Sequence, residues 1–182
     1  MISDKDKLRI HFKKIRKELS LIRKLEAKAK ALHILQNKAA KYANILSFAP
    51  LPFEIDIWDI NKLLAKQKKL LLPKILNNNL HIFKIDNIAH QLSKNPPFFI
   101  YEPIEENSME ILDLQTIYLA IIPALGFDKN NNRLGYGTGY YDKLLSKLND
   151  CYTIGIGFKE QLSNKLLPTD EHDISLNETI LF

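Results

Sequence analysis

Three glycines at alternate positions, flanked by charged and aromatic residues, mark the stretch of this sequence where chemistry is most expected. The stretch covers residues 133–142 and reads Arg-Leu-Gly-Tyr-Gly-Thr-Gly-Tyr-Tyr-Asp. The whole chain has six glycines, so three within five residues indicate backbone that bends sharply or that a ligand approaches closely. Backbone amides in such a loop, with the positive end of a following helix, suit a phosphate group.

Neither common nucleotide-binding pattern describes this loop. The spacing does not fit G-x-x-x-x-G-K-[ST], and the alternate glycines do not fit G-x-G-x-x-G. A plain surface loop is the alternative interpretation. Asp128 and Arg133 precede the glycines, and Tyr140, Tyr141 and Asp142 follow them directly. A solvent-exposed loop has no need of two aromatics and a carboxylate at the start of a helix, so a binding loop is favoured.

The segments on either side of the loop predict how it is held. Residues 117–122 form an apolar run that predicts a buried strand. After the loop, Tyr141, Leu144, Leu145 and Leu148 recur at helical spacing. The predicted order is therefore strand, glycine loop, helix. Ligands of α/β sheets bind beyond the carboxyl ends of the strands, which is where this loop is expected.

A first helix is predicted from an apolar series spaced by four and three residues: Leu8, Phe12, Ile15, Leu19 and Ile22. This spacing is typical of an amphipathic helix. Lys5, Arg9 and Arg16 fall on one stripe beside that apolar face. Cations that border a packed seam are held close to the protein, so these three are candidate ligands for an anion. Ordinary charge on a helix surface is the alternative.

The rest of the chain alternates predicted helices with predicted strands. Ser20 is the expected N-cap of a second helix that runs to about residue 42, and a third helix is expected at about 57–68. Two prolines at 96–97 predict a break in the chain. Further strands are predicted at residues 45–49, 70–72, 80–85, 152–158 and 179–182. The alternation predicts an α/β fold: a single-domain three-layer α/β/α sandwich over residues 1–182, Rossmann-like, with a largely parallel sheet.

Length and composition are those of one globular domain. A chain of 182 residues with 46% hydrophobic and 26% charged residues can bury one sizeable core. No run of about 18 apolar residues is present, so no membrane association is expected. The single cysteine, Cys151, excludes an internal disulfide and agrees with a cytoplasmic location.

The net charge of +5 is unevenly distributed along the chain. Residues 1–41 contain 13 Lys and Arg against 4 Asp and Glu, and the remainder is slightly acidic. A basic N-terminal segment is compatible with an RNA-binding surface. It is equally compatible with a solvated helix face, or with a few cations that serve a small anionic ligand.

Several segments carry a resemblance to a known family. They are Lys5, Leu8 and Arg9, then Arg16, Leu19 and Ser20, Glu54-Ile55-Asp56, Glu102-Pro103, residues 123–128, residues 133–142, Leu167-Pro168 and Asp173. In these segments and their order the chain resembles the 5-formyltetrahydrofolate cyclo-ligase family, also called 5,10-methenyltetrahydrofolate synthetase, over nearly its whole length. Three positions depart from the family pattern: Ala124 for glycine, Tyr136 for arginine, and Thr138 for glycine or lysine.

The resemblance implies an ATP-dependent ligase that forms a cyclic C–N bond. ATP would phosphorylate the formyl oxygen of 5-formyltetrahydrofolate, and the second folate nitrogen would attack the activated carbon. Phosphate would then leave 5,10-methenyltetrahydrofolate, with ADP as the other product. Such phosphoryl transfer requires positioning and charge neutralisation more than covalent help from the protein.

The resemblance also implies roles for particular residues. ATP would contact Lys5, Arg9, Arg133, Leu134, Gly135, Tyr136, Gly137, Thr138, Gly139, Tyr140 and Tyr141, so the N-terminal helices within 1–42 would contribute ATP contacts. Arg133 and Tyr141 would be catalytic. The substrate would contact Glu54, Tyr140 and Tyr141. Asp142 and Asp173 would hold Mg²⁺, although Asp142 could instead be a plain negative charge at a helix N-terminus.

The partners expected on this basis are ATP, Mg²⁺ and 5-formyltetrahydrofolate with or without a polyglutamate tail. We expect a cytoplasmic monomer that binds no nucleic acid and no membrane. Two alternatives remain open from the residues alone. One is a sugar-phosphate isomerase or CoA-transferase-like enzyme of similar fold, and the other is a basic RNA-binding module.

Tyr136 allows two interpretations at the centre of the loop. If its side chain faces the phosphates, it offers one neutral hydroxyl where an arginine would offer a charged fork. Alternatively its ring stacks on adenine or covers the folate. The glycine loop is already rich in amides, which favours stacking.

Overall fold

A seven-stranded sheet forms the centre of the computed structural model, which describes residues 3–95 and 100–182. The strand order is β11-β10-β7-β1-β2-β3-β6. The strands of the sheet are β1 Ile45–Leu46, β2 Leu70–Leu76, β3 Asn79–Ile85, β6 Met109–Glu110, β7 Leu119–Pro123, β10 Tyr152–Gly157 and β11 Glu178–Leu181. The strands β11, β10, β7, β1 and β2 pair with one another in parallel, and β3 pairs antiparallel with both β2 and β6. The largely parallel sheet is thus confirmed, while the predicted break at 96–97 lies outside the described residues.

Two short hairpins stand apart from this sheet. One pairs β4 Leu92–Asn95 with β5 Ile100–Pro103, and the other pairs β8 Gly126–Phe127 with β9 Arg133–Leu134. The α-helices are α1 Asp4–Glu18, α2 Leu21–Ala39, α3 Trp58–Lys66, α4 Ile88–Gln91 and α5 Tyr140–Leu145. Three 3-10 helices complete the described chain: η1 Glu105–Asn107, η2 Leu114–Thr116 and η3 Lys159–Gln161.

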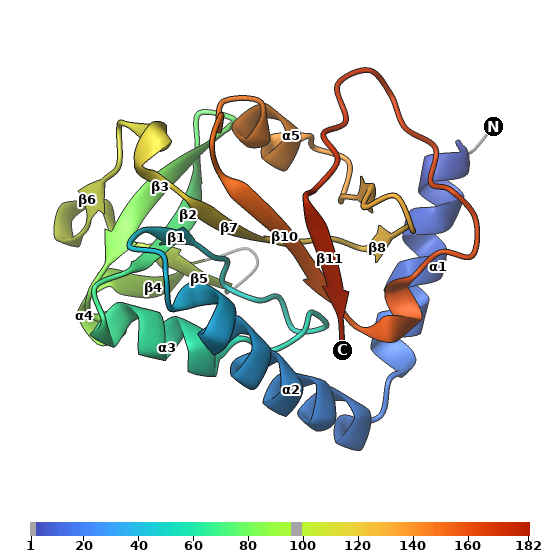
Figure 1. The fold of residues 1–182 in the computed structure, drawn as a ribbon, viewed down its shortest axis with the longest axis horizontal. Coiled ribbons are helices and arrows are strands. Elements are labelled where there is room, and N and C mark those ends of the chain that lie inside the picture. Colours follow the sequence, from blue (N-terminus) through green and yellow to red (C-terminus); the bar gives the residue numbers. More distant parts are fainter. Residues whose placement is uncertain (1–2, 96–99) are drawn as a thin grey trace.

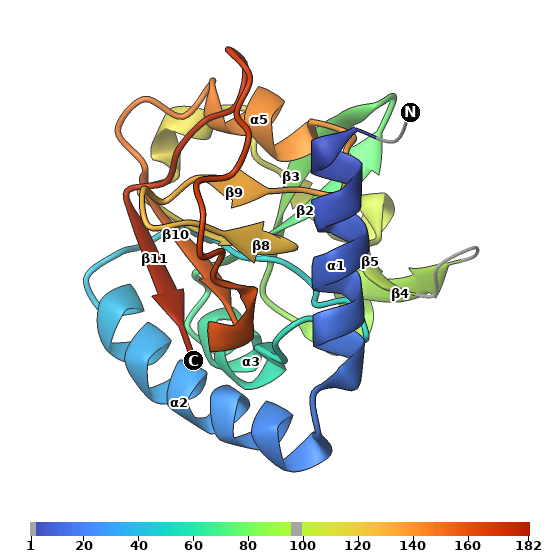
Figure 2. The same cartoon turned by 90° about the vertical axis from the view of Figure 1, so that its right-hand side faces the viewer.

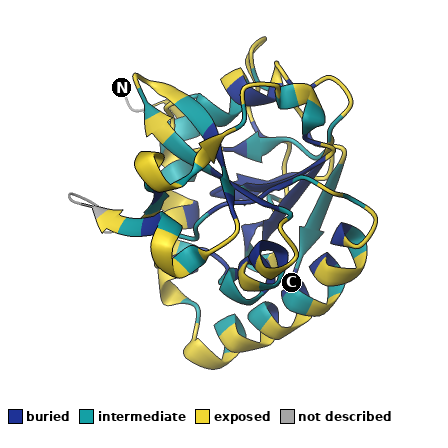
Figure 3. Ribbon diagram, turned by 90° about the vertical axis from the view of Figure 1, so that its left-hand side faces the viewer, coloured by how far each residue is buried: buried dark blue, intermediate teal, exposed yellow. Residues whose placement is uncertain are grey.

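The two faces of the sheet bury separate apolar clusters. On β7, Leu119 and Ile121 pack in the cluster that includes α2 and α3, while Ala120 and Ile122 pack in the cluster that includes Leu144 of α5. Successive strand residues point to opposite faces, which explains this division. Figure 1 shows α2 and α3 on one side of the sheet and α5 on the other. Figure 3 shows the buried strands between exposed helix surfaces. The predicted α/β fold is confirmed.

Helix α1 lies beside the sheet and packs on the β8–β9 hairpin (Figure 2). Its Phe12, 2% exposed, is buried with Leu125, Leu134 and Leu167 in a third apolar cluster. A Cβ added to Gly126 would lie 2.4 Å from the Phe12 ring, so only glycine allows the helix to come this close. The packing holds one side of α1 against the segment that leads into the glycine loop.

The boundary between the first two helices is set locally. The Ser20 side chain accepts a hydrogen bond from the Arg23 amide at 3.2 Å, which confirms the predicted N-cap. Helix α2 ends at Ala39, slightly before the expected residue 42. Ile22 was wrongly expected on the buried face of the first helix and is 72% exposed. The reason is that Ser20 begins a new helix, so the period of α1 does not continue into it.

No described helix is long and apolar enough to cross a membrane.

Candidate active site

The glycine loop joins β9 to α5. The sequence predicted that the loop follows the buried strand directly, but the β8–β9 hairpin lies between that strand, β7, and the loop. The hairpin turn is organised by Asp128, which is 1% exposed. Its carboxylate accepts hydrogen bonds from the amides of Asn130 and Asn132, at 2.9 and 3.0 Å, and from the Leu167 amide at 2.9 Å. Burial raises the pKa of Asp128, but these bonds and one from the Asn132 side chain outweigh it and lower the pKa. Asp128 therefore stabilises the hairpin turn that precedes the glycine loop, and its buried carboxylate is not exposed to a ligand.

The loop itself is open and leaves its amides free. Residues 135–138 are exposed, and Gly137 and Gly139 have φ angles of 110° and 67° that favour glycine. Within the described parts of the chain, no amide of residues 135–139 donates a hydrogen bond. The loop therefore presents several unpaired donors side by side, as an anion-binding loop requires. Helix α5 has six residues, so its dipole adds less than these amides.

The side chains of the loop differ in where they lie. Leu134 is 2% exposed and packs in the cluster of Phe12, so only its backbone remains available to a ligand. Thr138 is exposed, and Tyr140 is partly buried. Tyr141 is also partly buried and packs against the cluster beneath α5. Burial, and then the charge of Glu54, raise the pKa of the Tyr141 hydroxyl, so this hydroxyl stays protonated beside the carboxylate.

Arg9 and Lys5 of α1 lie at the rim of the site. The Arg9 Nε donates to the Gly135 carbonyl at 3.1 Å, and its Nη1 donates to Asp6 at 2.6 Å. Lys5 Nζ is 2.5 Å from Asp170 and 2.6 Å from Asp173. Burial lowers the pKa of Lys5, but the two carboxylates outweigh burial and raise the pKa overall, so Lys5 remains charged. The structure brings Arg9 to the predicted loop and places Lys5 between two carboxylates of the C-terminal segment.

Arg133 is turned away from solvent. Its side chain is 4% exposed, and its Nη2 donates to Asp142 Oδ1 at 2.6 Å. Its Nη1 donates to the carbonyl of Ile174, and the Ile174 amide donates to the same Asp142 oxygen at 3.1 Å. This network ties the start of α5 to the C-terminal segment. Arg133 and Asp142 therefore direct their charges at each other, whereas the sequence predicted an ATP contact for Arg133 and a Mg²⁺ contact for Asp142.

A second buried network lies under Tyr136. The Arg16 Nη2 donates to the Tyr136 hydroxyl at 2.7 Å, and that hydroxyl donates to Glu54 Oε1 at 2.7 Å. The other oxygen of Glu54 accepts from the Leu51 amide at 2.9 Å. The side chains of Arg16 and Glu54 are 4% and 5% exposed. The Tyr136 hydroxyl thus faces the predicted substrate residue Glu54.

The two predicted metal ligands are carboxylates that lie close to the same backbone segment. Asp142 Oδ1 and Asp173 Oδ2 accept the bonds of Arg133, Ile174, Lys5 and the Asp170 amide. The second oxygen of each carboxylate accepts no hydrogen bond from any described residue. Burial raises the pKa of Asp173, but Lys5 and the Asp170 amide outweigh it and lower the pKa. Among the described residues, no three His, Cys, Asp or Glu side chains form a metal-binding group.

Two contributors to this site differ from the predicted set. Arg16 was a candidate anion ligand on the cationic stripe of the first helix, but its side chain is buried against Tyr136 and Glu54. Asp170 pairs with Lys5 from 165 residues away. No local pattern in the sequence indicates this pairing.

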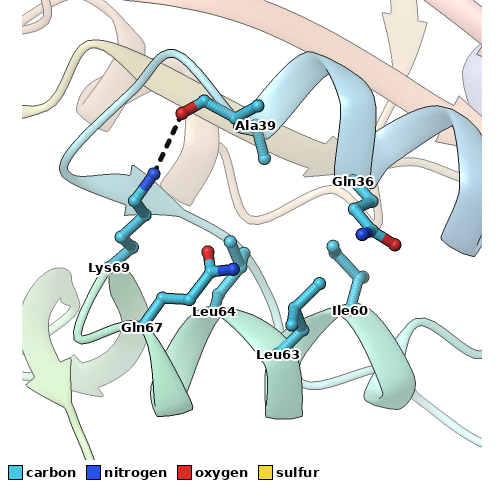
Figure 4. Close-up of a pocket in the computed structure, with 8 residues that line it drawn as sticks. Gln36, Ala39, Ile60, Leu63, Leu64, Gln67 and Lys69 are labelled. Carbon is cyan, nitrogen blue, oxygen red and sulfur yellow. Dashed lines mark hydrogen bonds between the residues drawn. The ribbon is translucent and has the colours of Figure 1, made fainter.

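A separate pocket of about 210 Å³ lies between α2 and α3 (Figure 4). Gln36, Leu63 and Gln67 line it, and Lys69 at its edge donates to the Ala40 carbonyl at 3.1 Å. None of its lining residues is a predicted site residue. Its volume is below the range of about 300–1,000 Å³ that ligand sites usually have. The glycine loop therefore remains the candidate active site.

The protein is of the α/β class, and its open glycine loop, with amides unpaired among the described residues and cations at its rim, has the features of an anion-binding loop. Comparison with known proteins narrows this class. The chain belongs to the 5-formyltetrahydrofolate cyclo-ligase family, whose model matches residues 1–181.

The similarity extends to individual relatives. The chain is 30% identical to 5-formyltetrahydrofolate cyclo-ligase of Mus musculus, covering 81% of this chain and 77% of the relative. It is 27% identical to that of Haemophilus influenzae, covering 97% of each. The NMR structure of Aquifex aeolicus 5,10-methenyltetrahydrofolate synthetase superposes with a TM-score of 0.85 and 26% identity, covering 97% of this chain and 89% of that one. The synthetase structure from Mycoplasma pneumoniae, at 23% identity, a TM-score of 0.77 and 98% coverage of both chains, supports the fold.

Proposed function

We propose that this protein converts 5-formyltetrahydrofolate to 5,10-methenyltetrahydrofolate with ATP as co-substrate, releasing ADP and phosphate. Family membership implies both the folate substrate and ATP. It does not favour a sugar-phosphate isomerase or CoA-transferase-like activity. The reaction needs a site that holds a triphosphate and a folate together, so that the terminal phosphate reaches the formyl oxygen.

The observation that carries the proposal is the loop 135–139, whose amides have no acceptor among the described residues, with Arg9 beside it. Amides that no protein acceptor satisfies are available to phosphate oxygens. Arg9 already contacts the loop carbonyl at Gly135, so its guanidinium is held where a phosphate on the loop would lie. Lys5 lies in the N-terminal half of α1, as Arg9 does. Its bonds to Asp170 and Asp173 are exchangeable, because the side chains that form them are partly exposed. In this proposal the loop and these two cations bind the triphosphate.

The substrate side of the proposal rests on Glu54 and the tyrosines. Glu54 is an acceptor that keeps unused lone pairs after its bonds to Tyr136 and the Leu51 amide. It suits the N–H donors of a pterin ring. Tyr141 lies close enough to Glu54 for the two to influence each other electrostatically, and its protonated hydroxyl suits a formyl oxygen. Tyr140, at the same helix start, completes the proposed substrate contacts.

Asp142 and Asp173 fit the prediction of Mg²⁺ because each keeps one carboxylate oxygen without a described partner. Oxygen ligands from one or two carboxylates, with phosphate and water, are what this ion prefers. When bound, Mg²⁺ would neutralise phosphate charge. Arg133 orients Asp142, and the Asp170 amide orients Asp173, so each carboxylate is held in place by a donor. Arg133 is proposed to act on catalysis from this position.

The charges of the basic N-terminal region are more consistent with binding of a small anionic ligand than with binding of RNA. Of the 13 cations within residues 1–41, eight form ion pairs with carboxylates: Lys5, Lys7, Arg9, Lys14, Arg16, Arg23, Lys28 and Lys38. Paired cations offer less attraction to a nucleic-acid backbone than free ones. A monomeric state, a cytoplasmic location and the use of polyglutamylated folate stay predictions.

The direct test mixes the purified protein with 5-formyltetrahydrofolate, ATP and Mg²⁺ and follows the near-ultraviolet absorbance of the methenyl product. We expect product only when ATP and Mg²⁺ are both present, with one ADP per product. Product without ATP, or none from folded protein, would contradict the proposal. Omission of each component in turn is the control.

A further inference from the structure

Tyr136 belongs to the glycine loop, but its hydroxyl forms hydrogen bonds outside the loop, with Arg16 of α1 and with Glu54. Both bonds are 2.7 Å long. An arginine side chain has donors and no acceptor, so the direction of each bond is fixed. The hydroxyl accepts from Arg16 and donates to Glu54 Oε1. Lysine or arginine at position 136 could not form this bridge, because neither can accept a hydrogen bond.

The chemistry of the bridge keeps Glu54 available as an acceptor. Burial, and then the charge of Glu54, raise the pKa of Tyr136, so its hydroxyl remains a donor. The Arg16 Nη1 lies 3.6 Å from Glu54 Oε1, so a cation faces the carboxylate directly. The Leu51 amide fixes the second oxygen. Glu54 is thus held by three groups from three segments of the chain.

Arg16 retains unused donor capacity. Its Nε and Nη1 are buried and have no hydrogen-bond partner among the described residues. Unpaired buried donors are costly, so such a group is commonly completed by a water or by a bound molecule. The Nη1 lies 3.6 Å from Glu54 Oε1, so a group that completes it would lie beside this carboxylate.

We propose that Tyr136 and Arg16 are positioning residues for the substrate, which together hold the Glu54 carboxylate ready to accept hydrogen bonds from the folate ring. This inference rests on the proposed function, since it takes Glu54 as the folate acceptor. It assigns the Tyr136 side chain to the substrate, while the backbone of the same residue remains part of the phosphate loop.

The contacts of Tyr136 favour this role over the two earlier interpretations. A phosphate oxygen could accept a bond from the hydroxyl only after displacing Glu54, because the hydroxyl has one proton to donate. Stacking on adenine would compete with two cations near the ring, since Lys13 Nζ lies 5.9 Å and Arg16 Cζ 5.5 Å from its centroid. Neither interpretation explains why a phenol bridges a buried guanidinium and a buried carboxylate.

The test measures the affinities of 5-formyltetrahydrofolate and of a non-hydrolysable ATP analogue by calorimetry for the parent and for Tyr136→Phe. Loss of a hydrogen bond to a charged group should weaken folate binding about tenfold. The affinity for the ATP analogue should stay within about twofold, because the loop backbone is unchanged. Tyr118→Phe is the matched control, since Tyr118 is 48% exposed and its hydroxyl has no described partner. It should bind both ligands like the parent.

A double-variant cycle tests whether Tyr136 acts through Glu54. In the Glu54→Gln background, Tyr136→Phe should change folate affinity less than about twofold, because the positioned carboxylate is already gone. Full additivity would overturn the inference, as would a Tyr136→Phe variant that loses ATP affinity and keeps folate affinity. A folate-specific loss supports the inference even if the parent forms no product, in which case only the proposed reaction fails. A folded parent that binds no folate overturns both.

Discussion

The two ends of α1 bring cations to one site in different ways. At the N-terminal end, the side chains of Lys5 and Arg9 are 19% and 21% exposed and pair with carboxylates at the rim. Near the C-terminal end, Arg16 is 4% exposed and faces the buried Glu54 through Tyr136. All three lie on the stripe that helical spacing predicts.

The difference in burial between the two ends of α1 predicts different effects on ligand affinity and on folding stability. Partly exposed ion pairs contribute roughly 0–1 kcal/mol to folding, so they can exchange partners for a ligand at little cost. Removing one member of a buried pair leaves the other charge unpaired, which costs about 3–5 kcal/mol. We therefore expect the rim cations to act on ATP affinity and Arg16 to act on folding as well as on substrate binding.

The largest expected effect follows from Arg16→Met. The variant keeps a long side chain but leaves Glu54 buried without its cation, so the free energy of unfolding should fall by about 3 kcal/mol. Urea denaturation of parent and variant measures it. Lys17→Met, on the exposed side of α1, is the control and should change stability by less than about 0.5 kcal/mol. Equal losses in the two variants would abolish the contrast between the ends of the helix.

Arg9→Ala should act on ATP with folding intact. Removing a charged hydrogen-bonding partner costs roughly 1.5–3 kcal/mol, which corresponds to about a ten- to hundredfold weaker ATP affinity. The Michaelis constant for ATP and the thermal midpoint measure the two effects separately. Lys17→Ala, which lies off the stripe, should leave both unchanged. If Arg9→Ala lowers stability and not ATP affinity, the rim does not serve the nucleotide.

The smallest expected effect is the pH dependence of the Lys5–Asp173 pair. Because the pKa of Asp173 is lowered in the folded state, its contribution to stability is present above its ordinary value of about 3.9. That contribution is lost as the pH falls through the lower folded value. Asp173→Asn should therefore reduce stability by at most about 1 kcal/mol at neutral pH, and the difference should shrink below about pH 4.

Denaturation of parent and Asp173→Asn across pH 3–7 checks this expectation. Glu171→Gln is the control, because the Glu171 side chain is 85% exposed and belongs to the same segment. A difference that stays constant with pH would mean that the Asp173 charge is not the cause. Such a result would mean that the Lys5–Asp173 pair has no electrostatic role in folding.

Local patterns predicted the elements well where one segment determines its own structure. The Ser20 side chain caps α2 as expected, and the apolar run before the loop is buried in β7. The hairpin between β7 and the loop was missed, because it depends on Asp128 bonding the amide of Leu167, 39 residues away. Each two-residue strand of this hairpin is also too short to give an alternating pattern.

The sequence by itself determined that three cations share one face of α1 and that three glycines form a loop before a helix, since helical spacing and glycine content are local properties. Only the tertiary structure decided which groups those cations meet. Lys5 pairs with Asp173 across 168 positions, and Tyr136 bonds Glu54 across 82. Which distant groups meet depends on the packing of Phe12 against Gly126, which places α1 beside the hairpin and the loop. Contacts of this kind follow from the closeness of whole elements in space, which spacing along the chain does not encode.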